Sequence, residues 1–205
     1  ESIKTRGIIT PVTLRQKEDG RYEIVSGHRR TKACELAGLI TVKAEIKEMS
    51  RDEATILMVD SNLQRSHIYP SERAFSYMML LGAMKRQAGR PIQDNYSPVG
   101  NNFSTPTSAD ELSELVGESK TQIFRYIRLT ALIPPLLELV DQNRIAMRPA
   151  VEISYLTKEE QQSLNETISY EESTPSLAQA IKMREFSKNG KLNGDVILSI
   201  MSEQK

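Results

Sequence analysis

The sequence predicts an α+β fold, in which a small α/β lobe is followed by an all-α helix-turn-helix domain and a helical tail. Three observations lead to this prediction. Short strand-like runs occur only before residue 50, and apolar residues at helical spacing dominate after it. A stretch rich in Pro, Asn, Gly and Ser at 89–107 separates two helical regions. A chain of 205 residues can hold one large or two small cores, and this order favours two small ones.

Three strands are expected in the first lobe, at residues 12–14, 22–25 and 40–46. The first two flank a polar turn at 17–20. Between the second and third strands, residues 29–37 have the composition of a helix. A mixed arrangement of short strands around one helix is therefore the predicted frame of this lobe.

The helix over 29–37 should end at a glycine, because Gly38 tolerates the left-handed conformation that commonly closes a helix. Its buried stripe is predicted to contain Ala33, Leu36 and Ala37. The single cysteine, Cys34, is expected to be a small buried side chain of the same helix.

Ser50 and Glu53 have the spacing of a capping box, so a second helix should begin there and run towards Asn62. This helix completes a first lobe that we assign to residues 1–69. A connecting helix is predicted to begin at Pro70 and to span 70–88, with Ala74, Tyr77, Met78, Leu81 and Met84 on its apolar side.

A flexible loop is expected at 89–107, because this stretch has few large apolar residues to pack. Helices should resume at Ser108, which has capping-box spacing, and form a helix-turn-helix domain over 108–170. A C-terminal helical segment over 171–205 follows, and its first helix is expected to open at Pro175.

The centre of the second domain has the pattern of two short helices joined by a tight turn. Gly117 permits the left-handed turn, and Ser119 with Gln122 has the spacing that caps the second helix. The apolar faces of the two helices are expected to contain Leu112, Leu115, Val116, Ile123, Ile127 and Leu129. The start of such a second helix projects from the domain and can enter the major groove of DNA.

Polar side chains lie off the apolar stripe of this second helix. Gln122 and Arg125 carry the amide and guanidinium groups that can read adenine and guanine edges. Lys120 and Thr121 are better suited to phosphate contacts, and Arg128 either reaches phosphate or folds back. These residues alone leave an alternative open, in which the two helices are a plain helical hairpin whose charged face is only solvated.

A second candidate site lies in the first lobe. Gly27 follows the second strand, so the backbone can turn tightly there, and the helix that comes next directs unpaired amides towards the turn. Arg29 and Arg30 at the start of that helix favour an anion. A polar cluster at 61–65 (SNLQR) stands downstream of it.

Three motifs in this order resemble those of the ParB partition-protein family. Residues 7–11 (GIITP) resemble the family's Gly-Ile-x-x-Pro segment, 27–30 (GHRR) its Gly-Glu-Arg-Arg loop, and 61–65 its Glu-Asn-x-Gln-Arg motif. The similarity continues through the helix-turn-helix. It includes the helix that follows it, at 144–150, where the family resemblance adds Arg148 to the DNA-binding candidates.

This resemblance implies a sequence-specific DNA-binding protein of DNA partition or segregation, with a lobe that holds CTP and Mg²⁺ and closes a protein clamp around double-stranded DNA. Asn62 would supply an oxygen to Mg²⁺. The resemblance also implies a homodimer and a ParA-type ATPase as partner. The remaining nucleotide-binding candidates that it assigns are Thr10, Pro11, Gly27, His28, Arg29, Arg30 and Arg65.

The chain departs from the family pattern at two acidic positions. Ser61 stands where the family has a glutamate, which removes a carboxylate that could orient water, so CTP hydrolysis should be weak or absent. His28 replaces the glutamate of the loop and takes a negative charge away from the phosphates. No catalytic residue is assigned.

Three alternatives remain open at this point. The first is a DNA-binding regulator that has lost the nucleotide, and the second is a phosphotransferase on the same fold. A sulfiredoxin-like repair enzyme, by contrast, is disfavoured because its catalytic cysteine would fall at Gly27. The third is an interaction protein whose C-terminal helices form a dimer surface through Leu177, Ile181, Met183, Val196, Ile197, Ile200 and Met201.

Composition sets the remaining bounds. The 27 basic and 27 acidic residues cancel, but residues 119–150 hold five basic side chains against two acidic ones, which predicts a local basic face. No apolar run reaches the length of a membrane span, and a lone cysteine fits a reducing cytoplasm. The first residues have neither a start methionine nor a signal sequence, so we expect an internal fragment.

Overall fold

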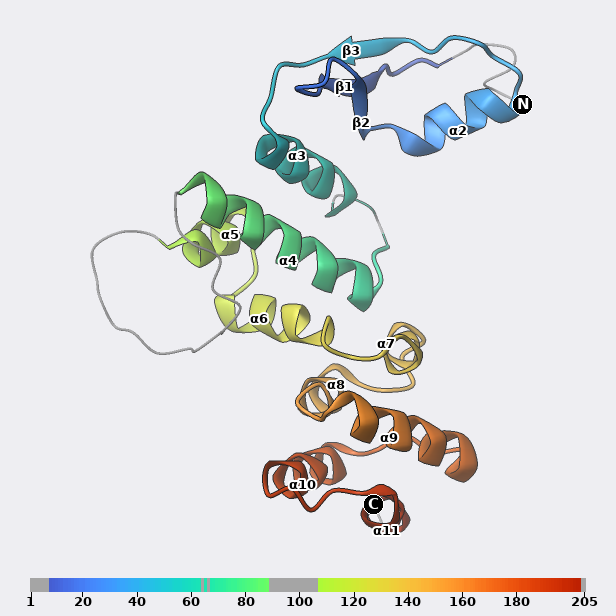
Figure 1. Ribbon diagram of the computed structural model, residues 1–205, viewed down its shortest axis with the longest axis vertical. Helices are drawn as coiled ribbons and strands as arrows, with labels where there is room; N and C mark the ends of the chain where they lie inside the picture. Colours follow the sequence, from blue (N-terminus) through green and yellow to red (C-terminus); the bar gives the residue numbers. More distant parts are fainter. Residues whose placement is uncertain (1–7, 64, 66, 89–106, 204–205) are drawn as a thin grey trace. The chain divides into compact units, whose positions relative to one another are not determined.

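The computed structural model describes residues 8–63, 65, 67–88 and 107–203 (Figure 1). Contacts divide the chain into two compact units, one of residues 1–66 with 79–104 and the other of residues 67–78 with 105–205. The α+β class is confirmed, because every strand of the described residues lies in the first unit. The loop predicted at 89–107 lies, except for residue 107, outside the described residues.

The first unit is built on a mixed three-stranded sheet of β1 (Val12–Gln16), β2 (Tyr22–Ser26) and β3 (Ala44–Ile46) (Figure 1). The strand order is β2-β1-β3, with β1 antiparallel to β2 and parallel to β3. The predicted turn between the first two strands is present, and the amide of Lys17 donates to the carbonyl oxygen of Arg21 at 2.7 Å.

The third strand is shorter than the predicted 40–46. Its pairing begins where Val12 faces Ala44, and the amide of Val12 donates to the carbonyl oxygen of Lys43. Within the described part of the chain no strand pairs with residues 40–42, and Ile40 is 99% exposed. The predicted strand is therefore wrong over residues 40–43. Strand length depends on the neighbouring strand as well as on propensity.

Helix α2 (His28–Leu36) follows β2 directly, with Gly27 as its first capping residue. Cys34 is buried beside Ile8 and Val12, as expected for a small apolar side chain. The predicted stripe is wrong at Leu36, which is 78% exposed. The small sheet covers only a narrow face of this helix, and Cys34 occupies that face.

Helix α3 (Arg51–Leu63) begins with the predicted capping box, because the amide of Ser50 donates to Glu53 and the amide of Glu53 donates back to the Ser50 hydroxyl. Ala54 and Val59 are its buried residues. The helix packs along β2, the strand that leads into Gly27. Helix α4 (Pro70–Gln87) begins at the predicted proline.

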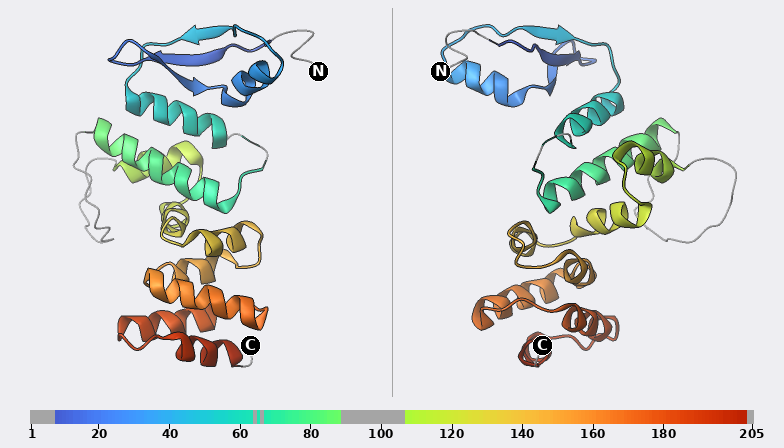
Figure 2. Two further views of the ribbon diagram at one scale, coloured as in Figure 1. Left: turned by 45° about the vertical axis from the view of Figure 1, so that its right-hand side comes forward. Right: turned by 180° about the vertical axis from the view of Figure 1, so that it is seen from behind.

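The second unit contains seven helices within residues 107–203, together with the first half of α4. They are α5 (Ser108–Val116), α6 (Lys120–Leu129), α7 (Pro134–Asp141), α8 (Met147–Ile153), α9 (Lys158–Glu171), α10 (Leu177–Lys188) and α11 (Gly194–Ser202). Helix α8 packs on α10 and α9 packs on α11, as the orange and red helices of Figure 2 show. Among the helices within the described ranges, none combines the length and the apolar content that a membrane span needs.

Two helices of the second unit have capping residues that differ from those predicted, although α5 begins at Ser108 as expected. Thr107 caps α5 in place of Ser108, which is buried. Ser176 caps α10 through a capping box with Gln179, so Pro175 precedes the cap and does not occupy the first helical position. In both cases the serine or threonine with the acidic or amide partner three residues later decides the start.

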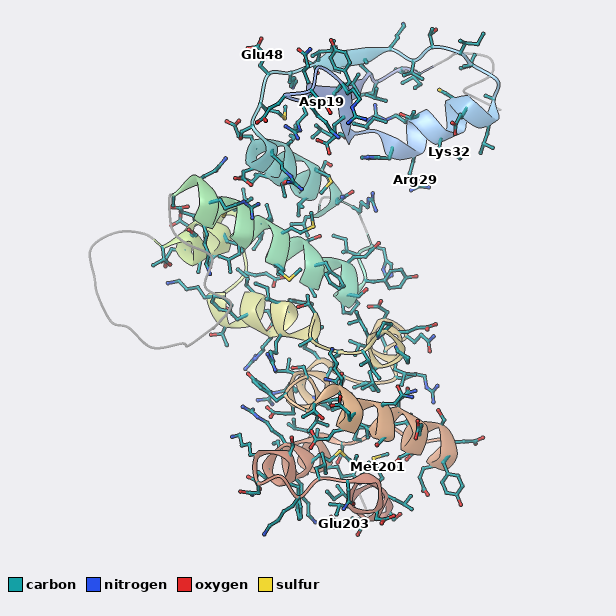
Figure 3. All side chains as sticks on the ribbon, in the orientation of Figure 1. Asp19, Arg29, Lys32, Glu48, Met201 and Glu203 are labelled. Carbon is teal, nitrogen blue, oxygen red and sulfur yellow. The ribbon has the colours of Figure 1, made fainter. Side chains whose placement is uncertain are left out.

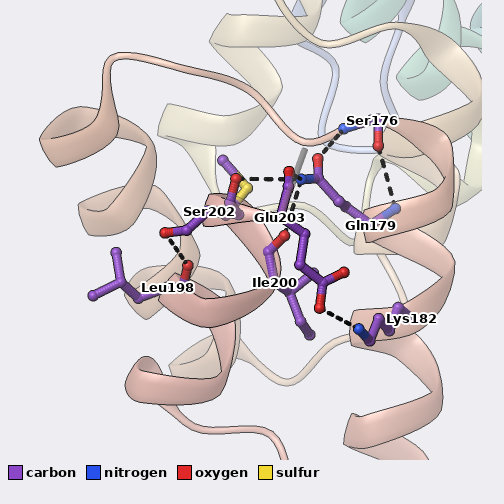
Figure 4. Close-up of polar contacts among 8 residues, drawn as sticks. Ser176, Gln179, Lys182, Leu198, Ile200, Ser202 and Glu203 are labelled. Carbon is purple, nitrogen blue, oxygen red and sulfur yellow. Dashed lines mark hydrogen bonds and ion pairs between the residues drawn. The ribbon is translucent and has the colours of Figure 1, made fainter. Parts of the chain in front are cut away.

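The C-terminal helices form part of the core of the second unit. Met183, Ile197, Ile200 and Met201 are almost fully buried in the same cluster as Leu129 and Leu136. Gln179 holds α11 in place, because its side-chain amide donates to the carbonyl oxygen of Ile200 at 2.9 Å (Figure 4). The hypothesis that these four residues form a dimer surface is therefore wrong.

Candidate nucleic-acid interface and anion loop

The turn between α5 and α6 has the geometry of a helix-turn-helix. Gly117 adopts a left-handed conformation with φ +68°, which closes α5. The Ser119 hydroxyl accepts a hydrogen bond from the amide of Gln122 at 3.3 Å and so caps α6. The Ser113 hydroxyl donates to the carbonyl oxygen of Glu118 at 2.6 Å, which fixes the turn from the other side. These contacts hold the first turn of α6 in one orientation.

Helix α6 has one face buried and another exposed. Ile123 and Leu129 are fully buried, as the apolar pattern predicts. Lys120, Thr121 and Arg125 are exposed, and Gln122 is half-buried. Because residues four apart share a face of a helix, Thr121 and Arg125 lie on the same side. The structure thus brings these four candidates together at the start of one helix.

Arg128 lies on the same helix but folds back into the second unit. Its Nη2 donates to the carbonyl oxygen of Ser154 at 2.7 Å and its Nε to the Ser154 hydroxyl at 3.0 Å. The guanidinium lies 4.0 Å from the centre of the Tyr155 ring, and Arg184 contacts that ring as well, at 3.6 Å. Burial lowers the pKa of Arg128. Of the two expected outcomes for Arg128, the structure shows the fold-back.

Arg148 lies next to α6. It lines a small hollow of about 150 Å³ together with Arg125 and Glu152. The carboxylate of Glu152 is paired with Arg184 at 2.7 Å, so its charge is already neutralised. Arg125 and Arg148 therefore make this edge of the unit positive.

Lys120 is paired inside the unit with Asp110 of α5. The pKa of Asp110 lies well below its usual range, first because Lys120 hydrogen-bonds to it and then because Thr107 does. Asp110 was not among the predicted site residues. Its spacing from Thr107 was a readable signal for a capping box, but its proximity to Lys120 depends on how α5 crosses α6.

A further brace of the helix-turn-helix comes from the first half of α4. Arg73 forms an ion pair with Glu118 at 2.8 Å and lies 5.3 Å from the centre of the Tyr126 ring. Tyr77 meets the Tyr126 ring edge to face, and burial, followed by the charge of Glu118, raises the pKa of Tyr77. No sequence signal linked these residues, since 45 positions or more separate the partners that α4 brings to the turn.

In the first unit, Gly27 occupies a position that no other residue fits without strain. Its φ is +109°, and a Cβ there would lie 2.7 Å from Cγ1 of Val12. No side chain caps α2, and its first turn has no acidic residue. The amides at this helix start are therefore available to an anion, and the backbone can approach it closely.

Arg30 joins the first two motifs. Its Nη1 donates to the carbonyl oxygens of Thr10 at 2.5 Å and Pro11 at 2.7 Å. His28 and Arg29 are exposed at the start of α2, where Figure 3 labels Arg29 and, one turn on, Lys32. The structure thus places Thr10, Pro11 and Arg30 around the Gly27 loop and leaves Arg29 accessible to a ligand.

The third motif closes on itself. The Asn62 side-chain oxygen accepts a hydrogen bond from Arg65 Nη2 at 2.6 Å. Ser61 donates its hydroxyl to the carbonyl oxygen of Met58 at 2.9 Å and is exposed. Gly7 and Gln64, which belong to the first and third motifs, lie outside the described residues. Within the described ranges, no group of three or more His, Cys, Asp or Glu residues is arranged to hold a metal ion.

Comparison with known proteins gives two matches to family models. Residues 1–63 match the ParB N-terminal domain, and residues 101–183 match the ParB HTH domain. The chain is 30% identical over 147 residues to a probable chromosome-partitioning protein ParB of Neisseria meningitidis serogroup A, covering 72% of this chain and 44% of that protein. The chain thus spans less than half the length of that relative.

Two further similarities have the same character. A nucleoid occlusion protein of Halalkalibacterium halodurans is 28% identical over 160 residues, which cover 74% of this chain and 56% of that protein. A C-terminally truncated ParB of Caulobacter crescentus, solved with the centromeric parS site, aligns over 92% of this chain and 86% of that chain. Its TM-score is 0.46 and its identity 20%. With both domain models matched in order, the chain belongs to the ParB family.

Proposed function

We propose that the chain binds double-stranded DNA sequence-specifically by placing α6 in the major groove, as part of DNA partition or segregation. The observation that carries this proposal is the held orientation of α6: its apolar face is buried, its start is capped by Ser119, and Lys120, Thr121 and Arg125 are exposed there. A rigid helix that presents polar side chains from its first turns is the element that reads base edges in this motif.

The roles of the side chains follow from their chemistry and exposure. Gln122 and Arg125 are the proposed base readers, since each can form two hydrogen bonds with one base. Lys120 and Thr121 are the proposed phosphate contacts, and Arg148, at the edge of the same hollow as Arg125, is a third. Arg128 is proposed to position α6 from behind, because Ser154 and Tyr155 already hold its guanidinium.

We further propose that the first unit binds CTP with Mg²⁺. The Gly27 loop fits a phosphate for two reasons. Residue 27 has no Cβ in the tight space beside Val12, and no side chain competes for the amides at the start of α2. Arg29 would contact the phosphates, with His28 beside it, and the backbone of Thr10 and Pro11 would face the base and ribose. Bound Mg²⁺ would offset the phosphate charge.

The oxygen of Asn62 is the proposed protein ligand of that ion, and it is free to serve only after Arg65 releases it. Arg65 could then turn to the phosphates. Ser61 keeps its hydroxyl on the Met58 carbonyl and has no carboxylate to orient water, so we propose slow hydrolysis or none. Homodimerisation, clamp closure and a ParA-type ATPase partner belong to the same proposal.

The DNA-binding part is tested by site-directed cross-linking. Cys34 is 1% exposed, so a thiol reagent should label only an introduced cysteine. Thr121 on α6 and Gln162 on α9 are both exposed. The variants Thr121→Cys and Gln162→Cys therefore supply matched attachment points. A photoreactive group on Thr121→Cys should cross-link to duplex DNA, and the same group on Gln162→Cys should not. Equal cross-linking from both positions would contradict the assignment of α6.

The nucleotide part is tested by calorimetry with CTP and Mg²⁺. Binding to the wild-type chain should weaken in Arg29→Ala and persist in Lys32→Ala, because both side chains are exposed on α2 but only Arg29 lies at the helix start. The absence of binding heat at high CTP concentration would contradict the proposal that the first unit binds CTP. The chain would then be a nucleotide-free DNA-binding regulator, and the assignment of α6 would stand.

A further inference from the structure

The carboxylate of Asp110 is held on both of its oxygens. Oδ2 accepts a hydrogen bond from the amide of Thr107 at 2.8 Å and from its hydroxyl at 2.6 Å. Oδ1 is left for Lys120, with which it forms an ion pair. Because the capping box already fixes Asp110, the pair restricts mainly the lysine side chain, and it joins the start of α5 to the start of α6.

The position of Lys120 makes this pair favourable. Lys120 is the first residue of α6, where the helix dipole is positive and disfavours a cation. A fixed carboxylate offsets that effect. The pair is nevertheless at the surface, with the side chains of Lys120 and Asp110 exposed by 49% and 33%. A DNA phosphate that approaches α6 can therefore compete for the same ammonium group.

We propose that Asp110 acts as an internal competitor for Lys120 and lowers the affinity of the chain for DNA of any sequence. This inference rests on the proposed function of α6. When DNA binds, either Lys120 stays on Asp110 and one phosphate is not neutralised, or the pair breaks and Asp110 takes up a cation from solution. Both routes reduce the net release of counterions by up to about one ion.

A purely structural role for the pair makes the opposite prediction. If Asp110 only fastens α5 to α6, its neutralisation loosens the turn, and DNA binding falls or stays the same. If Asp110 competes with phosphate, its neutralisation strengthens binding to every duplex. The sign of the change in affinity thus separates the two roles, and the salt dependence gives a second readout that folding stability does not move.

The test is the affinity of the 205-residue chain for a pool of random-sequence duplexes over a range of salt concentrations. Asp110→Asn removes the charge and keeps an oxygen for the Thr107 amide. Since a surface ion pair contributes modestly, Asp110→Asn should raise affinity about two- to fivefold at low salt. The plot of log affinity against log salt should become steeper by up to about one.

Glu111→Gln is the matched control, because it makes the same change of net charge one residue away. Glu111 is exposed, and none of the ion pairs within the described residues includes it. Its affinity should change less than that of Asp110→Asn, and its salt slope should match the wild type. In the double variant Asp110→Asn with Lys120→Met, the gain should disappear.

Three results would overturn the inference. One is an equal gain in Asp110→Asn and Glu111→Gln, which would indicate a general charge effect. Another is an unchanged or lower affinity of Asp110→Asn. The third is that neither the wild type nor any variant binds duplex DNA, in which case both the proposed function and this inference are wrong. In the first two results DNA binding is still measured, so the two failures are distinguishable.

Discussion

Gly27 shows at the scale of a single residue why the candidate anion-binding loop, residues 27–30, has its shape. Its positive φ excludes most side chains, and Cγ1 of Val12 occupies the space that a Cβ would need. The tight turn brings the start of α2 against β1, and Arg30 then closes the loop onto the carbonyl oxygens of Thr10 and Pro11. One residue type therefore sets both the backbone path and the accessibility of the amides.

Gly27→Ala should accordingly destabilise the chain by about 2–4 kcal/mol, from the left-handed backbone and the overlap with Val12 together. Urea unfolding measures this free energy. Gly20→Ala is the control, since Gly20 also has a positive φ of +79° but open space around its Cβ position. It should cost about 1–2 kcal/mol. Equal losses at the two glycines would show that the contact with Val12 has no energetic role.

Arg125 and Lys120 are proposed to make two kinds of DNA contact from one helix. Arg125→Ala should reduce discrimination between the preferred site and a random duplex by about 1–3 kcal/mol, because a base contact is lost. Lys120→Ala should weaken both duplexes to a similar extent, because a phosphate contact carries no sequence information. Titration of each variant with both duplexes measures these effects. Equal losses on the two duplexes for Arg125→Ala would contradict its assignment as a base reader.

Arg128 should behave differently from its neighbour Arg125. Arg128→Ala removes two hydrogen bonds to Ser154 and the contact with Tyr155, so it should lower the free energy of unfolding by about 2–3 kcal/mol. Arg125→Ala, which loses an exposed side chain, should change it by less than about 0.5 kcal/mol. If Arg128→Ala left stability unchanged and reduced the salt dependence of DNA binding instead, Arg128 would be a phosphate contact.

Element by element, local signals predicted the structure well where both partners of an interaction are close in sequence. The box between Ser50 and Glu53, the glycine turn at Gly117 and the cap of Ser119 are all present. Predictions failed where the decisive partner is remote. Leu36 has the right spacing for a buried stripe, but the sheet is too small to cover it. For Arg128 the sequence left phosphate contact and fold-back both open, because its partner Ser154 is 26 residues away.

The packing of the C-terminal helix α11 into the core of the second unit can be tested at two neighbouring residues. Ile197 is fully buried in the core of the second unit, whereas its neighbour Leu198 is 38% exposed. Ile197→Ala should therefore cost about 2–5 kcal/mol of stability, and Leu198→Ala less than about 1 kcal/mol. Thermal unfolding distinguishes them. A large loss for Leu198→Ala with a small one for Ile197→Ala would indicate that another molecule covers the exposed side of α11.

For the whole molecule, the order of the motifs predicted the family and the α+β class, and the two matched domain models confirm both. The site geometry could be predicted only in part. The sequence indicated which residues lie near Gly27 and on α6, but the pairing of Lys120 with Asp110 and of Asn62 with Arg65 required coordinates. Such side-chain pairs depend on how two helices cross and on how the backbone turns after a helix ends. Hydrophobic periodicity specifies neither.

We propose that α6 reads base edges while the Gly27 loop responds to CTP. The most direct test is selection of bound genomic fragments by the wild-type chain and by Arg125→Ala, each with and without CTP and Mg²⁺. The wild type should enrich a defined site, Arg125→Ala should enrich it with a relaxed preference at one base pair, and CTP should change the distribution of fragments around it. Enrichment of no sequence by the wild type, or of the same site with the same preference by Arg125→Ala, would contradict the claim.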